Sequence, residues 1–150
     1  MTSVALAALL QFSALAVGGN NYAQAYREAS ESGRPMLLLI TADWCPGCQV
    51  MKNSTLPQMA RQGGLEDVNL VILNYDQNTA LCRKMMRGNS IPQLVMYYKN
   101  DTGWRRRGLV GKQSIASVAS MVKLGVDASI AARADKGPRV ARAKDDTKDE

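Results

Sequence analysis

Two cysteines separated by two residues are the part of this sequence with the most definite chemistry. Cys45 and Cys48 follow a run of apolar residues and open a segment with helical spacing, so we expect them where a buried strand ends and a helix begins. The first backbone N–H groups of a helix are unpaired and carry partial positive charge, which stabilises a thiolate at Cys45. Because Cys48 lies one turn further along the same side, it is close enough to form a disulfide with Cys45.

Such a pair can exchange two electrons with a disulfide of another protein. Cys45 would attack first and form a mixed disulfide, which Cys48 would then resolve. This chemistry requires no cofactor and no histidine, and the chain contains no histidine. We therefore predict a thiol–disulfide oxidoreductase that acts on protein disulfides or dithiols and works with a redox partner protein that the sequence does not identify.

Other uses of the cysteine pair stay open at this stage. Two cysteines can be half of a zinc site, but the chain has only three cysteines and no histidine, so four such ligands are not available. Copper(I) held by Cys45, Cys48 and a nearby methionine is chemically allowed, because soft ligands select this ion and eight methionines are present. The third alternative is a structural disulfide in a binding module that performs no catalysis.

The composition narrows the remaining classes of function. Without histidine the chain has no Ser–His or Cys–His catalytic pair and lacks the usual general base at neutral pH. The formal net charge is +6, but the longest basic run is Arg105–Arg107 and aromatic residues make up only 5%. We therefore expect no nucleic-acid partner. A chain of 150 residues has the length of one ordinary domain, and we expect it to be a monomer.

The N-terminal segment has the features of an export signal. Val4 to Val17 is a mostly apolar stretch of 14 residues, which is too short to span a bilayer, since that takes about 20. Ala14-Leu15-Ala16 has the small-x-small form of a cleavage site. Met1 to Ser3 carry no lysine or arginine, so an N-terminal helix packed on the domain is the alternative. We expect residues 1–19 to be a signal peptide or N-terminal hydrophobic segment.

This interpretation predicts a periplasmic or secreted protein, with a cytoplasmic location as the alternative and with no membrane span in the mature chain. At the other end, residues 131–150 are rich in charges of both signs and are expected to be a flexible tail. The domain itself is then expected over residues 20–130.

Helical and strand patterns alternate through this domain. We expect a helix over 21–32 and another that opens at the cysteines and runs to about Arg61, with a kink or an early end at Pro57. Further helices are expected over 79–87 and 114–126. Strands are expected over 36–40, 69–75, 91–98 and 104–110, the last two forming a hairpin. This order predicts an α/β fold with a mixed sheet of about four strands and helices on both faces, the strands before the hairpin being parallel and the last antiparallel.

Two separated motifs resemble the thioredoxin superfamily. The first is Asp43-Trp44-Cys45-Pro46-Gly47-Cys48 after the apolar strand, and the second is Ile91-Pro92 before the hairpin. The resemblance covers the chain from about Tyr22 to Val126 and implies the thioredoxin fold. Together with Met51 to Leu56, the first motif is most similar to the thioredoxin-like domain of DsbD-type periplasmic disulfide reductases and related exported proteins.

The resemblance also implies roles for single residues. Cys45 corresponds to the attacking cysteine and Cys48 to the resolving one. Trp44 corresponds to the tryptophan that flanks the site and covers one side of it. Pro92 corresponds to a proline that follows a cis peptide bond and faces the disulfide, and Ile91 to the residue whose backbone pairs with an incoming polypeptide.

Two departures from the commoner thioredoxin pattern are visible. Pro46 and Gly47 stand between the cysteines in the reverse of the usual order, and they shape the helix entry and tune the balance of thiol and disulfide. Leu39 occupies the position of the buried carboxylate six residues before the first cysteine. The proton acceptor for the resolving thiol is therefore absent there, or its role passes to Asp43 or to water.

Two further features are expected to be structural. Cys82 falls between the inward positions of a predicted helix, so a buried free thiol is expected. Arg105 and Arg107 should share one solvated face of the hairpin, because side chains alternate along a strand.

Overall fold

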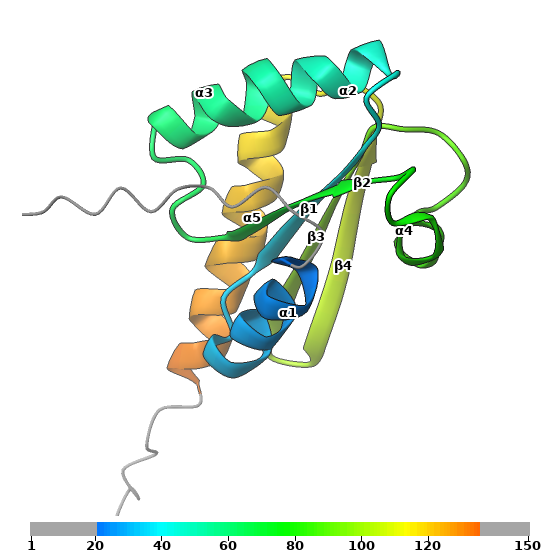
Figure 1. Cartoon of the computed structure of the whole chain (residues 1–150). Helices are drawn as coiled ribbons and strands as arrows, with labels where there is room; N and C mark the ends of the chain where they lie inside the picture. Colours follow the sequence, from blue (N-terminus) through cyan, green and yellow to red (C-terminus); the bar gives the residue numbers. More distant parts are fainter. Residues whose placement is uncertain (1–20, 136–150) are drawn as a thin grey trace, which may run out of the picture.

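The computed structural model describes residues 21–135 of the chain (Figure 1). The predicted signal segment at residues 1–19 and most of the predicted tail lie outside these described residues. Within them, each predicted helix and strand is present. The elements follow in the order α1 (Asn21–Ser32), β1 (Met36–Thr41), α2 (Pro46–Val50), η1 (Met51–Thr55), α3 (Leu56–Arg61), β2 (Asn69–Asn74), α4 (Thr79–Met85), β3 (Gln93–Asn100), β4 (Gly103–Val110) and α5 (Ile115–Ala134).

The four strands form one mixed sheet in the spatial order β2-β1-β3-β4. Strands β1 and β2 are parallel, whereas β3 is antiparallel to both β1 and β4. The predicted parallel pair before the hairpin and the antiparallel last strand are therefore confirmed, and the structure adds that β3 runs antiparallel to β1. The seven residues of α4 span only about 10 Å, roughly half the length of a six-residue strand. The chain therefore re-enters the sheet at the end where β2 leaves it and must run back.

Helices cover both faces of the sheet and bury two core clusters. All residues of β1 are buried, and they alternate between the faces. Leu37 and Leu39 pack with residues of α3 and α5, whereas Leu38 and Ile40 pack with residues of α1 and α4. Full burial of one such side chain contributes about 1.5–3 kcal/mol. The central strand thus fixes the position of the loop that follows it.

The helix after the cysteines continues to Arg61, as predicted, and Pro57 marks an irregularity in it. The turn before this proline is π-helical, with the Leu56 N–H bonded to the Met51 carbonyl. Pro57 itself stands in the first turn of α3, where its missing N–H costs least. Met51 and Met59 are buried, whereas Val50 is 41% exposed.

The last helix is two turns longer than predicted, since α5 ends at Ala134 rather than at Val126. Its buried side continues through the small residues Ser129 and Ala132, whose apolar signal is weak. Residues 131–134 therefore belong to this helix and not to a tail. Among the described helices, α5 alone is long and apolar enough to cross a membrane. Val118, Met121, Val122 and Val126 of this helix pack with β1 and β3 in one core cluster, whereas Leu124 and Ile130 are exposed. The helix lies along the sheet (Figure 1).

Candidate active site around Cys45 and Cys48

Cys45 and Cys48 form a disulfide at the junction of β1 and α2, with 5.2 Å between their Cα atoms. Cys45 is the N-cap residue of α2 and has an extended backbone, while Pro46 begins the helix. Proline suits this position because its fixed φ is already helical and the N–H it lacks would be unpaired there. The cysteine pair therefore lies directly after β1, the most buried strand, where Pro46 starts the following helix.

The surroundings of the two sulfurs differ. The Cys48 backbone N–H points at Cys45 Sγ over 3.3 Å, and this sulfur lies 3.8 Å from the carbonyl oxygen of Ile91. Cys45 is 7% exposed, whereas Cys48 is 0% exposed. An incoming sulfur therefore meets Cys45 first, at the atom whose negative charge a backbone N–H stabilises.

Ile91 and Pro92 lie against the cysteine pair, although they are more than 40 residues away along the chain. The peptide bond between them is cis in the structure, as the resemblance implies. A Cβ atom added to Gly47 would lie 3.4 Å from Pro92 Cδ, so the proline ring packs closely on the glycine. Ile91 packs on the cluster that contains both cysteines. The structure thus brings these five predicted site residues together.

Trp44 lies beside this group and is 67% exposed. Its indole N–H donates to Asp76 Oδ2 over 3.0 Å, a contact that the sequence analysis missed. Asp43, considered above as a proton acceptor, is exposed. Its carboxylate accepts a hydrogen bond from Asn74 and forms an ion pair with Lys52. Its oxygens are therefore already engaged on the outside of the site.

Gln93 is a further residue that the sequence analysis missed. This side chain is 2% exposed, and its amide makes three hydrogen bonds to the loop that precedes Pro92. The nitrogen donates to the carbonyls of Arg87 and Ser90 over 2.9 and 2.8 Å, and the oxygen accepts from the Arg87 N–H over 3.1 Å. The signal in the sequence is a lone amide at the start of an otherwise apolar strand. Gln93 fastens the loop that carries Ile91 and Pro92.

The third cysteine, Cys82, is buried and free, as predicted. It belongs to the core cluster beneath α1 and α4, not to the cluster of Cys45 and Cys48. Burial raises the pKa of the Cys82 thiol, because an apolar environment disfavours the thiolate. Arg105 and Arg107 are exposed and share one face of β4, as expected. Residues 21–135 contain no group of three or more histidine, cysteine or acidic side chains that could hold a metal ion.

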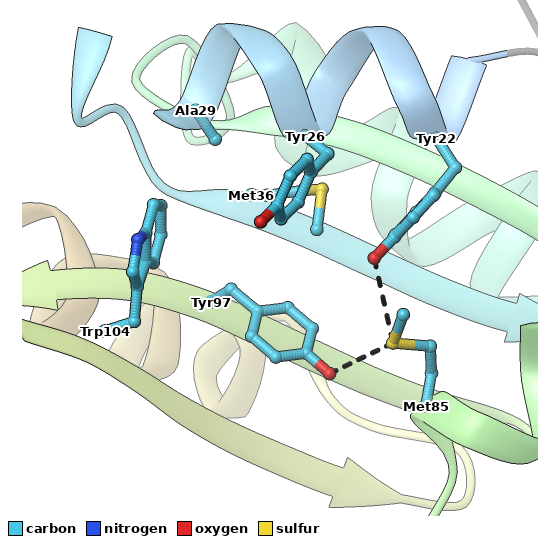
Figure 2. A pocket seen from close by; sticks show the side chains of 7 residues that line it. All are labelled: Tyr22, Tyr26, Ala29, Met36, Met85, Tyr97 and Trp104. Carbon is cyan, nitrogen blue, oxygen red and sulfur yellow. Dashed lines mark hydrogen bonds between the residues drawn. The ribbon is translucent and has the colours of Figure 1, made fainter. Parts of the chain in front are cut away.

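A separate cleft lies between α1, α4 and the hairpin (Figure 2). Its volume is about 290 Å³, and its lining consists of Tyr22, Tyr26, Ala29, Met36, Met85, Tyr97 and Trp104. The hydroxyls of Tyr22 and Tyr97 point to the sulfur of Met85. Tyr26 is 55% exposed. None of the site residues described above lines this cleft.

Comparisons with known proteins agree with this geometry. A family model described as thioredoxin-like matches residues 19–99. The thiol:disulfide interchange protein TxlA homolog of Synechocystis sp. is 35% identical over 88 residues, which are 58% of this chain and 47% of that protein. The chain thus spans about half of the length of this curated relative.

Solved thioredoxins share the fold. A thioredoxin from Thermus thermophilus has a TM-score of 0.58 at 21% identity, over 69% of this chain and 82% of that one. Thioredoxin O2 from Arabidopsis thaliana has a TM-score of 0.54 at 17% identity, over 70% of this chain and 86% of that one. The predicted α/β fold is thereby confirmed, whereas the narrower similarity to DsbD-type reductases stays a prediction.

Proposed function

Because the chain belongs to the thioredoxin-like family, we propose that it exchanges the Cys45–Cys48 disulfide with disulfides of other proteins. One observation carries this proposal. Cys45 Sγ, at the start of a helix, accepts the Cys48 N–H and retains some exposure, whereas Cys48 has none. The cysteine that must attack is therefore the less buried of the two and has a backbone N–H to stabilise its thiolate, and the cysteine that must resolve is shielded from other partners.

The proposed reaction balances within the two proteins. In the dithiol form, the Cys45 thiolate attacks one sulfur of a substrate disulfide, and the other substrate sulfur leaves as a thiolate that takes up a proton. Cys48, once deprotonated, attacks Cys45 in the mixed disulfide and releases the second substrate thiol. Two electrons have then passed to the substrate, and the chain holds the Cys45–Cys48 disulfide seen in the structure. A dithiol partner returns it to the starting form, and the same steps reversed would oxidise a substrate.

The site residues around the pair have supporting parts in this proposal. Trp44, Pro46 and Gly47 shape the entry to the helix and the wall beside the disulfide. The backbone of Ile91, with Pro92, is the place where an extended substrate segment would pair beside Cys45, which lies 3.8 Å from the Ile91 carbonyl. We also propose that the protein works outside the cytoplasm, which the apolar stretch from Val4 to Val17 supports.

Reduction of insulin by dithiothreitol tests the catalytic proposal. The wild-type chain should accelerate the precipitation of the insulin B chain, and Cys45→Ser should abolish the acceleration. Cys48→Ser should trap a mixed disulfide that gel electrophoresis resolves without reductant. Cys82→Ala is the matched control and should retain the wild-type rate. Equal rates for wild type and Cys45→Ser would show that the disulfide is structural. Cell fractionation, with the mature N-terminus read by mass spectrometry, tests the location.

A further inference from the structure

A hollow opens beside the disulfide, between α4 and the loop that leads to β3. Its volume is about 540 Å³, and its lining is Tyr75, Arg83, Met86, Gly88 and Asn89. Tyr75 also packs on the cluster of Cys45 and Cys48. The hollow and the disulfide therefore share a wall, and a polypeptide bound at the disulfide can place a neighbouring side chain in the hollow.

Among the described residues that line the hollow, Arg83 alone is charged. Its Nε donates to the hydroxyl of Tyr75 over 3.3 Å, which orients the guanidinium. Its two terminal nitrogens make no hydrogen bond within residues 21–135. The ion pairs in that part of the chain join Lys52 to Asp43 and Lys123 to Asp127, so Arg83 has no acidic partner there.

The charged side chains of α4 and of the loop after it are all basic. Lys84 and Arg87 are exposed on α4 and the loop after it, and residues 77–100 contain no aspartate or glutamate. The nearest acid along the chain is Asp76, whose carboxylate is bound to the indole of Trp44. An anionic group that entered the hollow would therefore meet an oriented cation with no ion-pair partner in residues 21–135, and no carboxylate among the residues that line the hollow.

We propose that this hollow selects substrates with an acidic side chain close to the cysteine that Cys45 attacks, and that Arg83 binds this carboxylate. The inference rests on the proposed function and extends it to the class of substrate. A guanidinium whose terminal nitrogens are both free can bind a carboxylate through two parallel hydrogen bonds. Lys84 and Arg87 add attraction at longer range, which accelerates encounter and weakens as salt is added.

Two short disulfide-containing peptides that differ only in glutamate or glutamine next to the cysteine provide the test. At low salt the wild-type chain, kept reduced by dithiothreitol, should reduce the glutamate peptide with a kcat/KM about threefold higher, because exposed ion pairs give effects of this size. Arg83→Gln should remove the preference, so that the ratio of kcat/KM for the two peptides falls to about one. Arg61→Gln on α3 is the matched control and should keep the preference. Raising the salt should reduce the wild-type preference toward unity.

The outcomes separate this inference from the proposed function. Equal rates on the two peptides, or the same preference in Arg83→Gln, overturn the inference while leaving disulfide exchange in place. If neither peptide is reduced, the proposed function fails. The inference is then tested by binding alone: fluorescence anisotropy measures the Kd of each labelled peptide, with its disulfide intact, for the oxidised chain. A lower Kd for the glutamate peptide that Arg83→Gln abolishes supports the inference, and equal Kd values overturn it.

Discussion

The two places where cysteine occurs in this chain differ mainly in the groups that surround the sulfur. Cys45 and Cys82 are both buried by side-chain exposure. At Cys45, a helix-terminal N–H and a carbonyl oxygen lie around the sulfur. At Cys82, core side chains surround it, and burial raises the pKa of the thiol. The polar groups that the fold directs at a sulfur therefore bear on its expected reactivity together with its exposure.

The largest expected effect is a difference in alkylation. In the reduced protein, iodoacetamide should modify Cys45 about a hundredfold faster than Cys82, because only Cys45 combines access with a stabilised thiolate. Peptide mapping by mass spectrometry measures both rates. In denaturant the two alkylation rates should converge. Comparable rates in the folded chain would show that the surroundings of Cys45 and Cys82 do not make the two thiols differ in reactivity.

The next effect concerns the loop that completes the site. Gln93→Ala removes three hydrogen bonds and should cost about 1–3 kcal/mol of unfolding free energy. It should also lower kcat/KM for disulfide exchange about tenfold, since Ile91 and Pro92 lose their support.

A buried hydrogen bond at the far end of the same strand supplies the control. Ser129 Oγ donates to the Lys99 carbonyl over 3.2 Å, so Ser129→Ala should lower stability and leave the exchange rate intact. If both variants lost activity only in proportion to their unfolded fraction, Gln93 would be a general stabilising residue and not a positioning residue.

The ionisation of Cys82 should contribute to the change of the unfolding free energy with pH. An unfolded chain ionises this thiol near its ordinary pKa of about 8.5, whereas burial raises the pKa in the folded chain. Above the ordinary pKa, the unfolded state binds fewer protons than the folded state, so the unfolding free energy falls until the folded pKa is reached. Denaturant titrations of the disulfide-bonded protein should show a shallower fall for Cys82→Ala than for wild type. If the unfolding free energy of Cys82→Ala fell with pH as steeply as that of wild type, the pKa of the Cys82 thiol would be the same in the folded and unfolded chains.

The smallest effect should come from the contact between the cysteine loop and the proline. Gly47→Ala places a Cβ 3.4 Å from Pro92 Cδ, which is tight but tolerable for a van der Waals contact. We expect a change of about twofold in the exchange rate and less than about 1 kcal/mol in stability. Val50→Ala, at an exposed position of the same helix, should change neither. A complete loss of activity in Gly47→Ala would show that the two loops have no freedom to adjust.

Local signals in the sequence were enough to predict the elements and the cysteine motif. Proline, glycine and capping residues mark element ends directly, which is why α1 and the entry to α2 were placed correctly. The direction of β3 was not predicted, because it depends on the length of α4 relative to the strands. The end of α5 was missed because buried small residues such as Ser129 give no apolar pattern.

Contacts between distant residues were beyond the reach of the sequence. Trp44 and Asp76 are separated by 32 residues, and neither residue type signals the other. Gln93 carried a local clue, but its role depends on burial and on where the loop before it turns. The sequence thus indicated the two cysteines that we propose to react, and the structure was needed to find the residues that surround them.

The register between β1 and β3 has a consequence for any attempt to move this site to another scaffold. The pairing places Ile40 opposite Gln93. The cysteine motif follows the end of β1, and the Ile91-Pro92 motif directly precedes the start of β3. A slip of one residue would turn the glutamine amide to the opposite side of the sheet and separate the proline from the cysteines, with both motifs unchanged in sequence. Grafting the two motifs into another protein would therefore transfer activity only if the register between the two strands were kept as well.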